Sequence, residues 1–193
     1  MTGVSAPPKP DRPIPAATVI LLRDQPAFEV LMVARPEAMA FAGGALVFPG
    51  GRIDPGDADP HWARHASGLD PILAAAQIAA IREAFEETGI LLARGEGDSD
   101  LVGAERVETI AAWRDEVSAD DRKFLDMIRA ERLELACDCL RLFAHWIAPP
   151  GLHRRFDTSF FAACCPDGQA ARADGAEATE AVWLAPAAVV AAR

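Results

Sequence analysis

Positively charged residues are outnumbered in this sequence, and long apolar runs are missing from it. The chain has 19 Lys and Arg residues against 29 Asp and Glu residues, which gives a formal net charge of −10 and an isoelectric point of about 4.8. Proteins that bind nucleic acids present a basic surface, so this balance argues against such a partner. No apolar run approaches the roughly 20 residues of a membrane-spanning helix. The sequence therefore predicts neither a nucleic-acid-binding nor a membrane protein.

Cysteines are few, and their spacing does not suit a bridge or a metal. The four stand as Cys137-x-Cys139 and as the adjacent pair Cys164-Cys165, a pattern that suits neither a zinc site nor an ordinary disulfide. We expect reduced thiols, which favour a cytoplasmic location. Residues 1–15 are rich in proline and lack the apolar stretch of a secretory signal, so we expect a flexible leader there.

The remaining composition is that of a globular domain. With 193 residues, 51% of them hydrophobic, the chain can bury one proper core, and we expect a single domain over residues 16–193. Residue patterns predict strands at 17–22, 28–33, 46–48, 140–148, 158–165 and 181–184. They predict helices at 72–87, at 109–135 as one or two segments, and from 186 onward. In the first helix, Ile78, Ile81 and Phe85 form a stripe that is expected to be buried.

Three glutamates fall within five residues of that first helix. Glu83 and Glu87 are four residues apart, so they lie one turn apart on one helix face, with Glu86 beside them. Like charges at this spacing repel each other by a few tenths of a kcal/mol on a solvated helix. A cation between them would explain the cluster, and hard oxygen ligands suit Mg²⁺ or Mn²⁺. A solvated acidic helix face explains these residues equally well.

The glutamates belong to a longer pattern. Residues 82–90 are Arg-Glu-Ala-Phe-Glu-Glu-Thr-Gly-Ile, and Gly51 precedes them in the turn Phe48-Pro49-Gly50-Gly51. These residues resemble the Nudix box, G-x5-E-x7-R-E-U-x-E-E-x-G-U, where U is aliphatic. The second half matches fully, whereas Asp57 stands where the family has its first glutamate, and whether it replaces that glutamate stays open. Arg82 follows Gly51 by 31 residues instead of 14, which predicts a 17-residue insertion within about residues 57–73. The Asp-Pro and Pro-Gly pairs there predict a surface loop.

An interrupted box resembles one branch of the Nudix hydrolases, that of the coenzyme A diphosphatase of mammalian peroxisomes. Residues 80–92, 145–149 and 154–161 resemble this branch as well. The resemblance implies an α/β/α sandwich around a mixed β-sheet, and an enzyme that hydrolyses a diphosphate bond with Mg²⁺ or Mn²⁺. It assigns Glu83, Glu86, Glu87 and the Gly50 carbonyl to the metal. Arg82 precedes Glu86 by four residues, so on a helix it can pair with Glu86 and hold it in place; the alternative is a plain surface ion pair. The branch continues with more helix after this point, which implies a shortened C-terminal part.

The resemblance also implies the substrate class, a small nucleoside diphosphate derivative. We expect coenzyme A or acyl-coenzyme A, split to 3′,5′-ADP and a phosphopantetheine product. ADP-ribose, NADH or another dinucleotide is the alternative within the class. A Nudix-fold nucleotide sensor without turnover is the alternative from another class, against which the intact set of three glutamates argues. A homodimer is left open.

Several other residues are candidates for substrate binding or proton transfer. Arg35 either binds phosphate or forms a salt bridge at the rim, and Phe41 either stacks on a base or belongs to the core. Arg154 and Arg155 either meet phosphate charge or lie in a surface turn. The general base is either a glutamate of the box or a late glutamate, for which Glu177 and Glu180 are the candidates.

Overall fold

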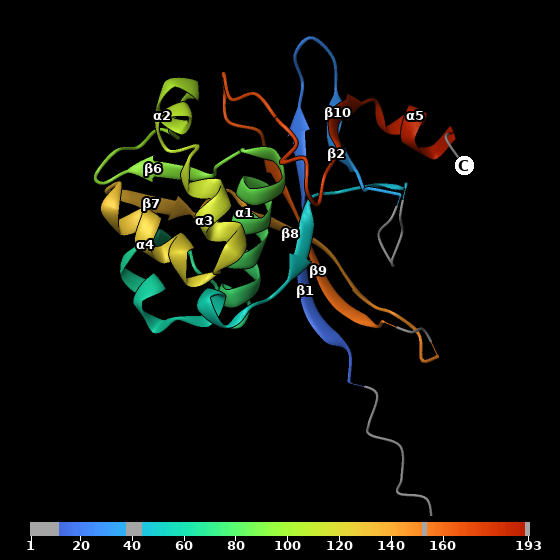
Figure 1. Ribbon diagram of the computed structural model, residues 1–193, viewed down its shortest axis with the longest axis horizontal. Coiled ribbons are helices and arrows are strands. Elements are labelled where there is room, and N and C mark those ends of the chain that lie inside the picture. The colour runs from blue at the N-terminus through green and yellow to red at the C-terminus, as the bar shows by residue number, and fades with distance from the viewer. Residues whose placement is uncertain (1–11, 38–43, 152–153, 192–193) are drawn as a thin grey trace, which may run out of the picture.

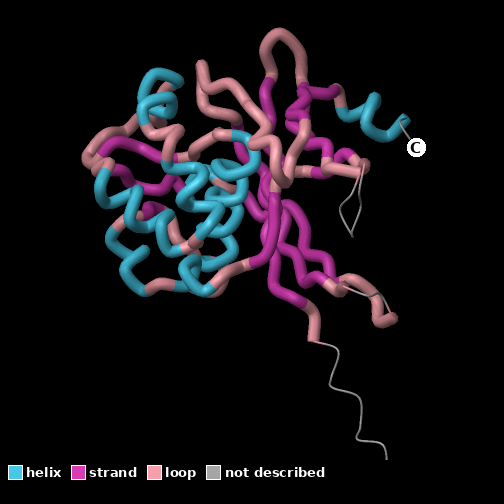
Figure 2. Tube along the Cα trace, in the orientation of Figure 1, coloured by secondary structure: helices cyan, strands magenta, loops and turns pink. Residues whose placement is uncertain are grey.

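A mixed β-sheet with helices on one broad side forms the body of the molecule (Figures 1 and 2). The computed structural model describes residues 12–37, 44–151 and 154–191. The main sheet has the order β10-β2-β1-β9-β8, with β3 paired to β2 and β4 paired to β1. The strands are β1 (Ile14–Arg23), β2 (Glu29–Ala34), β3 (Leu46–Val47), β4 (Gly50–Arg52), β8 (Arg141–Ile147), β9 (Phe156–Cys164) and β10 (Glu180–Leu184).

The central pair of this sheet is parallel, and its other pairs are antiparallel. β1 and β9 run parallel over nine residue pairs, from Ile14 beside Phe156 to Leu22 beside Cys164. β1 meets β2 only at its end, where Leu22 lies beside Val30, and further back its partner is β4. β1 and β2 therefore diverge like the arms of a fork. Between them lie β3, which pairs with β2, and β4, which pairs with β1. Gly50 and Gly51, which were expected in a turn, are instead the first two residues of β4, and they pair with Thr18 and Ala17 of the central strand β1.

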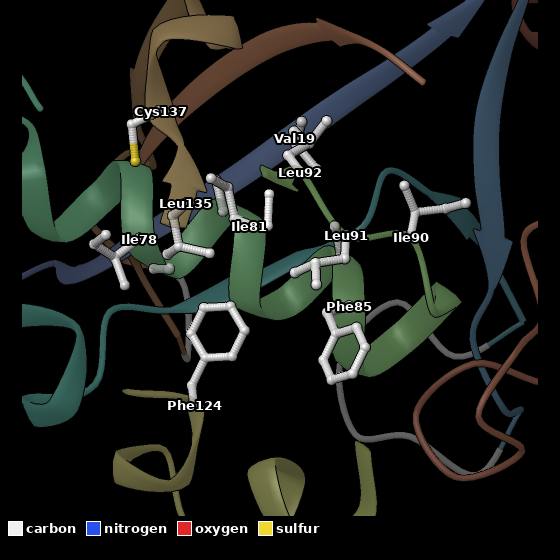
Figure 3. Close-up of a cluster of buried hydrophobic side chains, with 14 of the residues drawn as sticks. Val19, Ile78, Ile81, Phe85, Ile90, Leu91, Leu92, Phe124, Leu135 and Cys137 are labelled. Atoms are coloured by element: carbon white, nitrogen blue, oxygen red, sulfur yellow. The ribbon is translucent and has the colours of Figure 1, made fainter. Parts of the chain in front are cut away.

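The helix α1 (Ala74–Thr88) lies against the sheet over this fork. It ends at Gly89, whose positive φ of 74° suits a residue without a side chain. The predicted stripe is confirmed, since Ile78, Ile81 and Phe85 are completely buried. Figure 3 shows this stripe with Phe124 of α4 (Arg122–Ala130), and the Phe85 and Phe124 ring centroids lie 6.3 Å apart. Almost every face of α1 is covered, so the glutamates lie in a crowded setting rather than on an open surface.

The predicted surface loop in the insertion is wrong. Residues 55–67 form two 3₁₀ helices, η1 (Pro55–Ala58) and η2 (Pro60–Arg64), and the short strand β5 (Ala66–Ser67). The Trp62 side chain is 3% exposed, its Nε1 donates to the Gly56 carbonyl at 2.9 Å, and its ring packs on Phe124 with centroids 5.5 Å apart. The Gly56 amide in turn donates to the Asp121 carboxylate. Trp62 therefore anchors the insertion in the core beside α4, while most other residues of the insertion are exposed or partly exposed.

Two further predictions need correction. Residues 109–135 are not helical to their end, because Arg132 adopts a φ of 53° and the chain continues as β7 (Leu133–Ala136). β7 lies between β5 and β6 (Ala93–Gly95) in a second, three-stranded sheet that the sequence patterns did not predict. β1 begins at Ile14, so the last two residues of the predicted leader belong to the main sheet; residues 1–11 lie outside the described chain.

The remaining helices complete the body. They are α2 (Ala104–Thr109), α3 (Trp113–Ala119), α5 (Pro186–Ala191) and the 3₁₀ helix η3 (Cys137–Cys139). In Figure 1, α1 to α4 lie on one side of the sheet and the short α5 lies on the other. All four cysteines are free thiols, as predicted. None of the helices in the described residues combines the length and the apolar character that crossing a membrane requires.

Candidate active site

Gly50 and Gly51 of β4 lie directly against the glutamates of α1. The Gly50 amide donates to Glu87 Oε2 at 3.1 Å. A Cβ on Gly51 would lie 2.5 Å from Glu83 Oε1, and one on Gly50 would lie 2.5 Å from the Ala17 carbonyl oxygen of β1. Gly50 therefore requires glycine because a side chain would meet the backbone of β1, whereas a side chain at Gly51 would displace the Glu83 carboxylate. The sequence predicted that the backbone of these glycines would lie close to a bound molecule. In the structure it lies against β1 and the Glu83 carboxylate.

Arg82 holds the cluster together. Its side chain is 3% exposed, and Nη1 donates to Glu83 Oε1 at 3.0 Å and to Glu86 Oε1 at 2.7 Å. Nη2 donates to the Arg52 carbonyl at 3.0 Å and to Asp57 Oδ2 at 3.0 Å, while Nε donates to Asp57 Oδ1 at 2.9 Å. All five guanidinium N–H groups are thus used. The predicted Arg82–Glu86 pair is confirmed, and the geometry gives Arg82 a positioning role.

Asp57, which stands at the position of the first glutamate of the Nudix box, pairs with Arg82. Its carboxylate is 2% exposed and binds Arg82 through two parallel hydrogen bonds, an arrangement that adds both energy and orientation. Asp57 also accepts the Asp54 amide at 2.8 Å, which ties it to the start of η1. Asp57 therefore connects η1 to the hydrogen bonds around Arg82.

Burial and mutual repulsion make the glutamates reluctant to ionise. Burial raises the pKa of Glu83 to about 8, and the charges of Glu86 and Glu177 add to this rise. Burial also raises the pKa of Glu86 above its ordinary value, against the opposing effect of Arg82. The pKa of Glu87 lies well above its ordinary value because of burial and, in addition, the charge of Glu83. Clustered carboxylates with raised pKa values are typical of functional sites.

The donor chemistry of this cluster fits a hard divalent cation. Each of the three glutamates directs one oxygen to a protein donor, and no donor among the described residues binds the other. None of those second oxygens is a buried, unpartnered atom, so each has contact with solvent. Across the described residues, no three acidic, His or Cys side chains already converge as a formed metal site. Ligation would therefore require Glu83 and Glu86 to share their carboxylates between Arg82 and an ion.

Two of the remaining candidates lie near this cluster. The charge of Glu177 contributes to the raised pKa of Glu83, Glu86 and Glu87, after the dominant effect of burial. The charge of Arg35, at the end of β2, opposes the rise at Glu87. The charges of Glu177 and Arg35 therefore act on the glutamates of the box.

The other candidates are not brought to the cluster by any contact among the described residues. Glu180 is exposed and begins β10, beside Ala34. The Arg155 guanidinium donates to the Ala148 carbonyl at 2.8 Å, within the connection between β8 and β9, and Arg154 is exposed next to it. Phe41 lies outside the described residues.

Sequence patterns missed two residues that support the site. Arg114 of α3 donates through Nη2 to the Glu86 carbonyl at 2.8 Å and to the Arg172 carbonyl at 3.0 Å. Asp174 accepts three backbone amides in the segment that carries Glu177. Arg114 contacts residues that lie far away in the sequence, so no local pattern predicts its role. The Asp174 contacts are local, and the Asp174-Gly175 pair signals a turn without showing where in the fold that turn lies.

Comparisons with known proteins identify the family of this chain. The model of the NUDT19 Nudix domain matches residues 66–192. The acyl-coenzyme A diphosphatase NUDT19 of Xenopus laevis is 29% identical over 82% of this chain and 53% of its own length. The human protein of that name is 30% identical over 92% of this chain and 56% of its own length. The chain therefore spans about half the length of these curated relatives.

A solved structure agrees as well. A Nudix hydrolase from Alicyclobacillus acidocaldarius, 27% identical, superposes with a TM-score of 0.72 over 90% of this chain and 79% of that chain. The predicted fold class, an α/β Nudix fold around a mixed sheet, is confirmed. The chain belongs to the NUDT19 Nudix domain family of Nudix hydrolases.

Proposed function

We propose that this protein is a metal-dependent diphosphohydrolase, and that coenzyme A or acyl-coenzyme A is its substrate. The observation that carries the proposal is the buried cluster of Glu83, Glu86 and Glu87, in which each carboxylate keeps one oxygen in contact with solvent. Burying three like charges is costly unless a cation compensates for them. The names of the curated relatives, acyl-coenzyme A diphosphatases, support the substrate class.

The roles of the residues follow from their contacts. Mg²⁺ or Mn²⁺ held by Glu83, Glu86 and Glu87, with the Gly50 carbonyl beside them, would neutralise diphosphate charge and lower the pKa of a bound water. Arg82 keeps Glu83 and Glu86 in place through its Nη1. Arg35, whose charge reaches Glu87, meets the negative charge of the substrate.

The proton of the attacking water needs an acceptor outside the metal-binding set. The Glu177 carboxylate is exposed, and its charge reaches all three box glutamates, so it accepts this proton as the general base. The water oxygen bonds to one phosphorus, and the bridging P–O bond breaks. The products are 3′,5′-ADP and phosphopantetheine or its acyl derivative.

A substrate panel tests this function. Coenzyme A, 3′-dephospho-coenzyme A, ADP-ribose and NADH are each incubated with the protein and Mg²⁺ or Mn²⁺, and kcat/KM is measured for each. One charge-assisted contact to the 3′-phosphate contributes about 1.5–3 kcal/mol. The kcat/KM for coenzyme A should therefore exceed the kcat/KM for its 3′-dephospho form by roughly ten- to a hundredfold.

Two results would contradict the proposal at different levels. Equal kcat/KM for coenzyme A and its 3′-dephospho form would favour ADP-ribose or a dinucleotide as the substrate. No turnover of any of the four compounds with either metal would refute the hydrolase and favour a nucleotide-binding sensor.

A further inference from the structure

Glu177 stands in a turn that a neighbouring aspartate builds. Asp174 Oδ1 accepts the amides of Ala176 at 3.1 Å and Ala178 at 2.8 Å, and its Oδ2 accepts the amide of Glu177 at 3.1 Å. The Gly175 amide closes the turn by donating to the Ala178 carbonyl at 2.9 Å. Hydrogen bonds to a charged acceptor are about twice as strong as neutral ones. One side chain therefore fixes the backbone on both sides of Glu177.

Both ends of this segment are tied to the elements that form the site. At one end, the Arg172 amide donates to the Thr88 carbonyl, the last residue of α1, at 2.7 Å. At the other end, the Thr179 amide and hydroxyl donate to the carbonyl of Ala34, the last residue of β2, at 2.9 and 3.1 Å. Ala178 is completely buried between these anchors, whereas Glu177 is exposed. The turn thus spans from the end of the glutamate helix to the strand end beside Arg35.

We propose that Asp174 is a positioning residue of the hydrolytic site, and that its carboxylate holds the turn that places the Glu177 side chain beside the glutamates of α1. The inference rests on the proposed function, in which Glu177 accepts the proton of the attacking water. The hydrogen bonds of Asp174 within the described residues go to the turn and not to the glutamates of α1. Asp174 therefore acts through Glu177. The electrostatic influence of Glu177 on the three glutamates agrees with this placement.

A double-mutant cycle separates positioning from general support of the fold. The wild type, Asp174→Ala, Glu177→Gln and the double variant are compared by kcat and KM for coenzyme A at saturating Mg²⁺. Removing a general base lowers kcat by about 10²–10⁴-fold, and misplacing one by about 1 Å costs up to about 10²-fold. We therefore expect Asp174→Ala to lower kcat by roughly ten- to a hundredfold, with KM changed by less than about twofold.

The decisive comparison is made in the background that lacks the base. If Asp174 acts through Glu177, Asp174→Ala should cause no further loss in the Glu177→Gln protein, because coupled residues are not additive. Asp174→Asn keeps the oxygen that accepts two of the three amides, so it should recover most of kcat, and it carries the cycle if the alanine variant does not fold. Asp167→Ala removes the same charge from an exposed position in the preceding residues and should behave as the wild type.

Each other outcome overturns a defined part of the account. If the loss from Asp174→Ala is equally large in both backgrounds, or if kcat is unchanged while the melting temperature falls, Asp174 has only a structural role. Wild-type protein without turnover of any panel substrate would remove the proposed function and this inference with it. If the wild type turns over a panel substrate but the losses in kcat from Asp174→Ala and Glu177→Gln multiply in the double variant, only the positioning role of Asp174 is removed.

Discussion

Replacing Glu83 by glutamine should stabilise the metal-free protein at alkaline pH. The Glu83 side chain is buried against Gly51, and burial raises its pKa from 4.5 to about 8 in the folded protein. The folded state therefore holds this proton more tightly than the unfolded chain does. The wild type must therefore lose stability as the pH rises from about 4.5 to about 8. In this range the unfolded chain releases the proton readily, whereas the folded protein must bury the charge that the release creates. Glutamine has no such charge to bury, and its oxygen can still accept from Arg82.

The size of the effect follows from the pKa. At 1.36 kcal/mol per pKa unit, the rise from 4.5 to about 8 corresponds to about 5 kcal/mol if Glu83 titrates alone. Glu86 and Glu87 share the cluster, so protonation of either one makes it easier to charge Glu83. We therefore expect Glu83→Gln to raise the free energy of unfolding by about 2–4 kcal/mol at pH 8.5, and by far less at pH 5.5.

Urea unfolding in EDTA at the two pH values measures this difference. Glu116→Gln, at an exposed position of α3, removes the same charge and should change stability by less than about 0.5 kcal/mol at either pH. Adding Mg²⁺ should shrink the advantage of Glu83→Gln, because the ion stabilises the wild type by binding only its folded state. A variant that is equally stable with the wild type at pH 8.5, or stabilised by the same amount at both pH values, would refute the reasoning.

Three further substitutions test the surroundings of the glutamates. Gly51→Ala places a Cβ 2.5 Å from Glu83 Oε1, so Mn²⁺ binding by calorimetry should weaken at least about tenfold; Gly103→Ala, whose Cβ meets no atom within 4 Å, is the matched control, and equal affinities would contradict the prediction. Trp62→Ala should lower the free energy of unfolding by about 3–5 kcal/mol in urea, and a loss below about 1 kcal/mol would show that the insertion does not support the core. Asp57→Ala removes the two carboxylate oxygens that accept from the buried Arg82 Nε and Nη2 groups and should cost about 3–5 kcal/mol of stability; an unchanged melting temperature would show that Asp57 does not compensate Arg82.

Local patterns predicted the parts of the site that lie on one element. The spacing of Ile78, Ile81 and Phe85 gave the buried face of α1, and the four-residue interval between Arg82 and Glu86 gave their ion pair, because helix geometry alone relates these positions. The lack of side chains at Gly50 and Gly51 predicted that the backbone there would be closely approached. The groups that approach it are β1 and the Glu83 carboxylate of the protein itself.

The remaining parts depend on contacts between distant residues. The insertion is rich in turn residues, and its 3₁₀ helices of four and five residues are too short to show a hydrophobic period, so the sequence pattern did not predict the burial of Trp62 against Phe124. The predicted helix over residues 109–135 does not reach its end, because Arg132 adopts a positive φ before β7 begins. Such a φ is usual for glycine, so an arginine gives no sequence signal of it. The turn at Asp174 is tied to α1 and β2 through Arg172 and Thr179, whose partners Thr88 and Ala34 lie far away in sequence.

Release of 3′,5′-ADP from coenzyme A by the wild type and by Glu87→Gln tests whether the carboxylates of α1 form a metal-dependent hydrolytic site. The substitution removes a buried charge while preserving volume and an oxygen that can accept the Gly50 amide, now 3.1 Å from Glu87. At saturating Mg²⁺ we expect the wild type to turn over and Glu87→Gln to lose most of its activity with a cooperative thermal transition intact. EDTA should abolish wild-type turnover. Near-normal turnover by Glu87→Gln, or undiminished wild-type turnover in EDTA, would contradict the account.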